Sequence, residues 1–142
     1  MEPEAQQEVV ELLEHKEETA AGRMTTEFLA LPIKATVQNA IDSLREFEGG
    51  VEAISTIYLV DSQGTLVAAV PLAKIVLAHA YEPMLSLAQE PLVLAHQEAT
   101  ENEVAELFDK YNLQTLPVVD EKNKLTGVIT SDDVISMLRA KL

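Results

Sequence analysis

The sequence predicts an α/β (α+β) fold made of two β-α-β-β-α modules, packed with pseudo-twofold symmetry and preceded by one N-terminal helix. Three observations predict this fold: a strand–turn–strand pattern occurs twice, helical patterns flank each copy, and hydrophobic residues make up 47% of the 142-residue chain. A repeat that combines strands and helices over this length indicates a duplicated module. One copy of about 60 residues is marginal alone, so the two copies are expected to bury their sheet faces against each other.

An amphipathic helix is expected over residues 3–18. Pro3 suits a first helical position, and Gly22 lies where such a helix would end. The apolar residues of the segment recur at helical spacing and share one face: Ala5, Val9, Leu12 and Leu13. We therefore expect residues 1–23 to form a linker helix ahead of the repeat.

Two hairpins form the core of the repeat. Thr56–Leu66 and Thr115–Leu125 each contain an apolar β-prone run, an aspartate, three turn-type residues and the start of a second strand. The aspartates, Asp61 and Asp120, lie 59 residues apart. Aspartate, glycine and asparagine at these positions predict turns, because they bond their own backbone or tolerate left-handed conformations. The second strands are expected over residues 66–70 and 125–130.

A helix is expected before and after each hairpin. Thr36 and Thr100, 64 residues apart, begin the preceding helices, and Thr100 with Glu103 predicts a capping box. The following helices are expected over residues 73–80 and 132–141. The two offsets differ by five, so the first copy carries five extra residues ahead of its hairpin.

Composition excludes several classes of function. The chain has 24 acidic and 10 basic residues, a net charge of −14, so it lacks the basic face that nucleic-acid binding requires. Cysteine is absent, which excludes disulfides, thiolate nucleophiles and zinc–thiolate sites and fits a reducing compartment. Residues 1–20 carry no secretory signal, and no window approaches the roughly 18 apolar residues of a membrane span. The chain as given is expected to be soluble.

The end of the second copy carries a recognisable motif. An apolar-Pro-Val-Val-Asp strand, Leu116–Asp120, precedes a Gly-x-x-Thr-x-x-Asp segment, Gly127–Asp133, that enters a helix. This pattern resembles the end of a cystathionine-β-synthase-type (CBS) module, whereas the first copy matches in layout only. The resemblance covers roughly residues 24–142 and implies two modules, over 24–83 and 84–142.

The segment ahead of the first module has its own resemblance. Glu17–Phe28 is similar to the junction that joins the N-terminal helical domain to the CBS pair in MgtE-family magnesium transporters, although Gly22 lies one place closer to Met24 than is usual there. The resemblance implies that residues 1–23 end such a helical domain and that a transmembrane domain of the same chain follows Leu142. It further implies a homodimer formed through the CBS modules at the cytoplasmic face of the cell membrane.

The second module carries the candidate nucleotide site. Gly127 would let a ligand approach the backbone, helix N-terminal amides favour an anion, and Asp133 can accept from ribose hydroxyls. The CBS resemblance implies that these positions line a cleft for ATP or AMP, together with Leu116, Pro117 and Thr130. The alternative is that Thr130 and Asp133 form an ordinary helix cap. In the first copy Ala68, Pro71 and Lys74 stand at the Gly, Thr and Asp positions, so that site loses its ribose acceptor.

Acidic residues offer a candidate magnesium site. Mg²⁺ takes oxygen ligands and is often held between carboxylates of facing surfaces. The transporter resemblance implies such sensing and points to Asp133, with Asp132 beside it, while Thr100 removes one candidate carboxylate. Glu98, Glu101 and Glu103 lie nearby and could substitute. Taken one by one, these side chains are more commonly solvated surface groups.

Catalysis has little support in the sequence. His15, His79 and His96 lack metal-motif spacing, and no nucleophile-elbow or phosphate-loop pattern occurs. Tyr58 lies at a core-patterned position, with stacking on a base as the alternative. Three hypotheses remain: a cation-sensing and nucleotide-sensing regulatory domain of a magnesium transporter, an adenine-nucleotide-sensing CBS pair of an enzyme or stand-alone regulator, and a purely structural dimerisation module.

Overall fold

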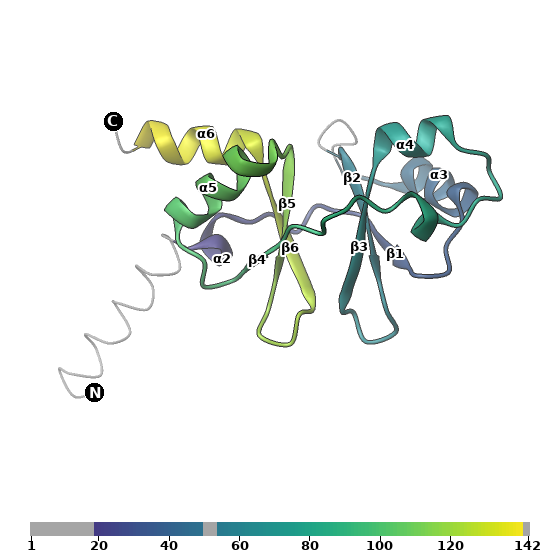
Figure 1. The fold of residues 1–142 in the computed structure, drawn as a ribbon, viewed down its shortest axis with the longest axis horizontal. Helices are drawn as coiled ribbons and strands as arrows, with labels where there is room; N and C mark the ends of the chain where they lie inside the picture. The colour runs from purple at the N-terminus through teal and green to yellow at the C-terminus, as the bar shows by residue number, and fades with distance from the viewer. Residues whose placement is uncertain (1–18, 50–53, 141–142) are drawn as a thin grey trace.

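The computed structural model describes residues 19–49 and 54–140. The helix expected over residues 3–18 lies outside the described residues. Within them, the expected β-α-β-β-α order is confirmed in both copies, and Figure 1 shows the two copies side by side. The first copy comprises β1 (Ala30–Pro32), α3 (Val37–Glu46), β2 (Thr56–Val60), β3 (Leu66–Pro71) and α4 (Leu72–Leu77). The second comprises β4 (Ala95–His96), α5 (Glu101–Tyr111), β5 (Thr115–Val119), β6 (Leu125–Thr130) and α6 (Ser131–Ala140).

Two short elements precede the copies: helix α2 (Ala20–Arg23) before β1, and the 3₁₀ helix η2 (Met84–Leu87) before β4. The helix expected over residues 73–80 ends early, because Ala78 already adopts an extended conformation. At the start of α5 the structure shows one of the two bonds of the expected capping box, from the Glu103 amide to the Thr100 hydroxyl.

The sheets have matching topology and register. β2 pairs parallel with β1 and antiparallel with β3, and β5 pairs in the same way with β4 and β6. Thr56 lies opposite Pro71 in the first sheet, and Thr115 lies opposite Thr130 in the second, which preserves the 59-residue offset. Both pairings shift register near their ends, after Leu59 and after Val118. The repeat detected in the sequence is therefore a structural repeat.

Each hairpin turn is built around its aspartate. Asp61 Oδ1 accepts from the amides of Gln63 and Thr65 at 2.9 and 3.0 Å, and Asp120 accepts from the corresponding lysine amides at the same distances. These backbone hydrogen bonds lower the pKa of both carboxyl groups. The two turns also meet: the Leu66 amide donates to Asn123 O, and the Leu125 amide donates to Gly64 O. The predicted turns are confirmed, and they join the modules at the lower end of Figure 1.

Three apolar clusters hold the fold together. The first module packs around residues such as Val37 and Ile57, and the second around residues such as Leu116 and Ile129. A third cluster lies between the sheets and contains Tyr58, Leu66, Val119 and Val128. In this third cluster, residues of the two sheets are buried against each other, as the sequence led us to expect.

The connecting segments cross between the modules. Ala20 and Met24, which precede β1, pack against the core of the second module. Met84 and Leu87, which precede β4, pack against the core of the first. Each module is therefore completed by the segment that leads into the other. The module boundaries inferred from the sequence, 24–83 and 84–142, stay a prediction.

Within residues 19–49 and 54–140, every helix is too short or too polar to cross a bilayer.

Candidate functional site

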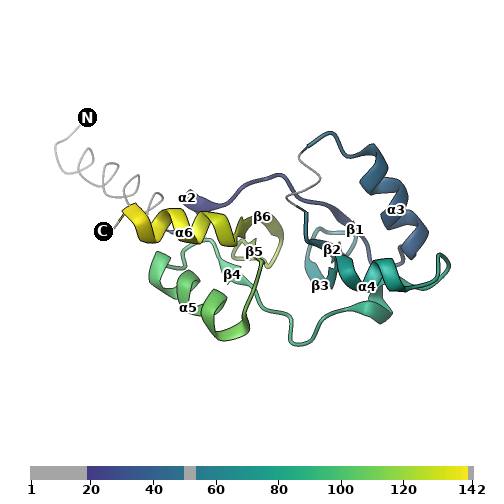
Figure 2. The ribbon, with the colours of Figure 1, turned by 90° about the horizontal axis from the view of Figure 1, so that it is seen from above.

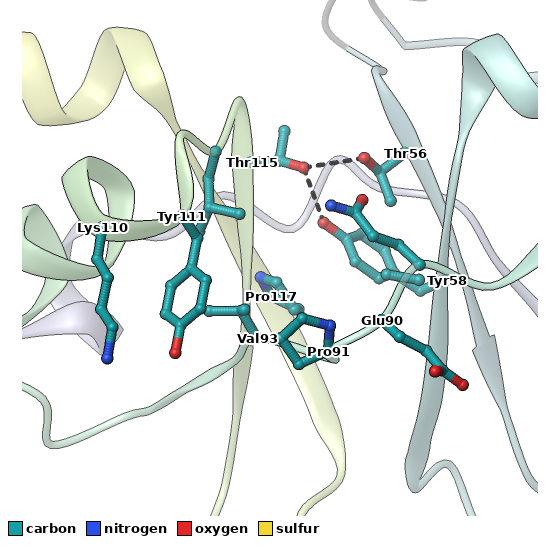
Figure 3. Close-up of a pocket in the computed structure, with 12 residues that line it drawn as sticks. Thr56, Tyr58, Glu90, Pro91, Val93, Lys110, Tyr111, Thr115 and Pro117 are labelled. Atoms are coloured by element: carbon teal, nitrogen blue, oxygen red, sulfur yellow. Dashed lines mark hydrogen bonds between the residues drawn. The ribbon is translucent and has the colours of Figure 1, made fainter.

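A cavity of about 350 Å³ opens between the two modules. The first module contributes β2 and β3, the second contributes the end of α5 and β5, and the segment before β4 forms the lower wall (Figure 3). Its lining consists of Thr56, Tyr58, Ala69, Gln89, Glu90, Pro91, Val93, Lys110, Tyr111, Leu113, Thr115 and Pro117. A second hollow shares part of this wall and extends toward the β3–α4 junction at Pro71 and Leu72. We call this connected space the open cleft.

A hydroxyl network closes the inner side of the open cleft. Thr115 Oγ1 lies 3.0 Å from the Tyr58 hydroxyl and donates to Thr56 Oγ1 at 3.3 Å. Thr56 and Thr115 are equivalent positions of the repeat, so the bond joins the modules at their pseudo-twofold axis. Tyr58 is 1% exposed, and burial raises the pKa of its phenol to about 12, against an opposing effect of the bond to Thr115.

The outer side of the open cleft carries charge and a second aromatic ring. Lys110 Nζ lies 5.2 Å from the centre of the Tyr111 ring, a cation–π distance. Glu90 lies across the cleft from this pair in Figure 3. The Gln89 amide donates to Ala69 O and fixes the segment before β4 against β3. The arrangement offers the Tyr111 ring, one ammonium group and threonine hydroxyls to a small planar, polar ligand, while the Tyr58 ring is buried behind this surface.

The structure places the residues predicted for nucleotide binding in different parts of the second module. Pro117 lines the open cleft, whereas Leu116 is fully buried in the second module's core. Gly127, Thr130 and Asp133 lie along β6 and the start of α6, outside the cavity lining. Nucleotide binding at these residues stays a prediction.

Thr130 and Asp133 bond each other at the start of α6. The Thr130 amide donates to Asp133 Oδ2 at 3.0 Å, and the Asp133 amide donates to Thr130 Oγ1 at 3.3 Å. This is the helix-cap alternative that the sequence left open. A ribose would have to compete with the Thr130 amide for the Asp133 carboxylate.

Gly127 is approached by the chain itself. A Cβ at this position would lie 2.6 Å from Met24 Sδ and 2.9 Å from the Thr25 carbonyl oxygen. Two main-chain hydrogen bonds of an isolated β-bridge hold this segment in place: the Thr25 amide donates to Val128 O at 2.8 Å, and the Val128 amide donates to Thr25 O at 2.9 Å. In the first module Ala68 stands at the equivalent position, and a wide hollow lies beside it. The two modules are therefore unequal, with Met24 packed over the second module's glycine.

The predicted metal residues lie at the starts of two helices. Asp132 and Asp133 lie in the first turn of α6, while Glu101 and Glu103 lie in the first turn of α5, just after Glu98. Glu101 is buried and its carboxylate pairs with Arg23 at 2.9 Å. Among the residues that the structure describes, no three carboxylates or imidazoles form a group able to hold a metal ion. A magnesium site at these residues stays a prediction and requires a second surface.

Sequence reasoning missed most of the open cleft. Lys110 and Tyr111 are the last residues of α5, and in the sequence they resemble solvent-exposed positions of a helix. The segment Gln89–Val93 shows neither a helical nor a strand periodicity. The alternation of β5 provides a signal, because Thr115 and Pro117 share the face that lines the cleft.

Comparisons with known proteins show that the chain is similar to CBS-domain proteins. Residues 86–140 match the CBS domain family. The magnesium transporter MgtE of Thermus thermophilus is 32% identical over 141 residues, which is 99% of this chain and 31% of that protein. MgtE of Bacillus subtilis is 29% identical over 94% of this chain and 30% of its own length. The chain therefore spans about a third of the length of the curated relatives it matches.

A solved structure extends the similarity to the fold. The cytosolic domain of the Mg²⁺ channel MgtE, crystallised in complex with ATP, superposes with a TM-score of 0.82 at 32% identity. The match covers 96% of this chain and 55% of that chain. These relatives are transporters rather than enzymes, in agreement with the expectation of a non-enzymatic role.

Proposed function

Because this chain is a CBS pair that resembles the cytosolic domain of MgtE magnesium transporters, we propose that it regulates a magnesium transporter. In this role it lies at the cytoplasmic face of the membrane, senses divalent cation and gates transport. The similarity across 99% of the chain, which includes the junction ahead of the first module, carries the proposal.

Sensing would work through the acidic residues at the starts of α5 and α6. Asp132, Glu98 and Glu103 are exposed, so their carboxylates are available to a facing surface. That surface belongs to an N-terminal helical domain, a transmembrane domain or a second subunit of the full-length protein. Mg²⁺ between such surfaces offsets the repulsion of like charges and favours the compact arrangement. Loss of the ion would let the acidic surfaces separate and release the pore.

The face that would join two subunits is formed by α4 and α6. Val76 and Leu77 on α4 are 77% and 87% exposed, and Ile135 and Leu138 on α6 are 50% and 51% exposed. Val76 and Ile135 are equivalent positions of the repeat. Figures 1 and 2 show α4 and α6 along the same edge of the molecule. A homodimer would bury this apolar band, which costs free energy while exposed to water.

Magnesium binding is tested by thermal unfolding. Millimolar MgCl₂ should stabilise the wild-type chain, by about 1.4 kcal/mol at a concentration ten times the Kd. Asp132→Asn with Asp133→Asn should abolish this gain while keeping the helix cap, because an asparagine oxygen can still accept from the Thr130 amide. Glu106→Gln with Asp109→Asn, on exposed positions of α5, is the matched control. Equal stabilisation of all three chains, or of the wild type by NaCl at matched ionic strength, would argue against a specific cation site.

A second ligand is favoured by the open cleft. Its size, the exposed Tyr111 ring and Lys110 suit an adenine nucleotide, with the base between the modules and the phosphates toward the ammonium group. The alternative location is the second-module motif, Gly127–Asp133, where Met24 and the helix cap would have to yield.

Titration with ATP or AMP, followed by amide resonances, distinguishes the two locations. We expect saturable shifts at Tyr111 and Thr115, which line the open cleft, and weaker shifts at Thr130 and Asp133. Lys110→Gln should weaken binding of ATP more than binding of AMP, because a longer phosphate chain gains more from the ammonium group. Shifts confined to Thr130 and Asp133 would place the nucleotide in the second module instead, and absence of shifts at millimolar ligand would remove this candidate.

A further inference from the structure

An ion pair between a half-exposed arginine, Arg23, and a buried glutamate, Glu101, joins the junction ahead of β1 to the second module. Arg23 Nη2 and Nε lie 2.9 and 3.0 Å from Glu101 Oε1. Within residues 19–49 and 54–140, Glu101 is the one charged side chain that is buried, with 9% of the side chain exposed. A carboxylate at this depth requires a charged partner, because burial removes its hydration. Glu101 also lies in the first turn of α5, where the helix favours negative charge.

Main-chain bonds on both sides of Arg23 support the same docking. The amides of Ala20 and Ala21 donate to Ala99 O and Gln97 O at 2.8 and 3.0 Å, just ahead of α5. On the other side, Thr25 exchanges two bonds with Val128 of β6. Ala20 is 1% exposed within the second module's core. The segment Thr19–Thr25, here called the strap, therefore belongs to the second module in space although it precedes the first in sequence.

The chain that leaves the strap contacts a residue of the open cleft. Phe28, three residues beyond the end of the strap, packs edge-on against Tyr58 with ring centres 6.5 Å apart. Tyr58 lines the cavity and bonds Thr115. Along the chain, the strap therefore lies between residue 19 and Phe28, which contacts the open cleft through Tyr58.

We propose that Arg23 and Glu101 form a charge latch that couples the second module to the part of the chain preceding residue 19. With the latch closed, the direction in which the chain enters the CBS pair is set by α5 and β6. Opening it frees the strap without unfolding either sheet, because the first module makes none of the strap bonds described above. Arg23 supplies the positive charge that Glu101 requires, so Glu101 in the closed latch is unavailable as a magnesium ligand. The coupling role rests on the proposed regulatory function, whereas the latch itself does not.

The test is amide hydrogen exchange on the 142-residue chain without magnesium or nucleotide. Glu101→Gln and Arg23→Gln should each raise exchange at Ala20 and Ala21 on the order of tenfold, because a charge-assisted bond is lost. Exchange at Tyr58, whose amide donates to Leu29 O in the first module, should stay unchanged. Arg23→Lys keeps the charge and should retain most of the protection, and Glu106→Gln, exposed on the same helix, should have no effect.

Unchanged exchange at Ala20 and Ala21 in both neutral variants would overturn the latch. An equal loss of protection at Ala20, Ala21 and Tyr58 would also overturn the latch, because the ion pair would then stabilise the whole fold rather than the strap alone. Since these measurements use no ligand, failure of the latch and failure of magnesium sensing are separate results.

Discussion

Replacing Gly127 with alanine is expected to lower the free energy of unfolding by about 2 kcal/mol, within the range of overpacked cores. The added Cβ would meet Met24 Sδ at 2.6 Å and the Thr25 carbonyl oxygen at 2.9 Å. The thioether can rotate away, but the carbonyl belongs to Thr25, which forms an isolated β-bridge with Val128, so the strap must shift. Urea denaturation measures the loss, and hydrogen exchange at Thr25 should accelerate with it.

A double-mutant cycle identifies the cause. Met24→Ala alone should destabilise by loss of packing in the second module's core. In the presence of Met24→Ala, Gly127→Ala should cost less, because only the contact with the Thr25 carbonyl remains. Additive costs would mean that Met24 and Gly127 do not share this space.

Stability should fall at high pH because of Tyr58. Burial raises the pKa of its phenol from 10.0 to about 12 in the folded chain. A group whose pKa is raised by folding contributes its full stability below the unfolded pKa and loses it as pH rises through the folded value. The loss should therefore develop between about pH 10 and pH 12 and be on the order of 2 kcal/mol for this 1% exposed side chain.

Tyr58→Phe is the matched variant for this prediction. It keeps the ring against Phe28 and removes the ionisable group, at a cost of about 1 kcal/mol at neutral pH for the bond to Thr115. Denaturation of both chains across the alkaline range should show a steeper loss in the wild type. If the free energy of unfolding fell with pH equally in both chains, the Tyr58 hydroxyl would be in contact with solvent, contrary to the structure.

The parts of the fold that local sequence determines could be predicted. Asp61 and Asp120 bond amides two and four residues ahead, so each turn is specified within a few residues and the repeat is visible at a constant offset. The order of strands and helices follows from the same local patterns. The crossing of the strap onto the second module could not be predicted, because Ala20 and Ala99 meet across a long stretch of chain and no periodicity records the contact.

The candidate site was predicted less well for a related reason. Gly127 fits a close approach, but a glycine does not say which group approaches it, and here it is Met24. Asp133 and Thr130 read equally as ligand residues or a helix cap, and the structure shows the cap. Glu101 read as one of several surface acids, because its partner Arg23 lies 78 residues away. Lining residues of the open cleft, such as Tyr111, gain their role only when the two modules pack.

We propose that this CBS pair senses magnesium, and a MgCl₂ titration of the isotope-labelled chain at constant ionic strength, followed by amide resonances, tests this claim. We expect saturable shifts at Asp132, Asp133, Glu98 and Glu103 in the millimolar range, with the interior strands unaffected. A response that does not saturate, or that spreads evenly over the acidic surface, would contradict the claim and leave only charge screening.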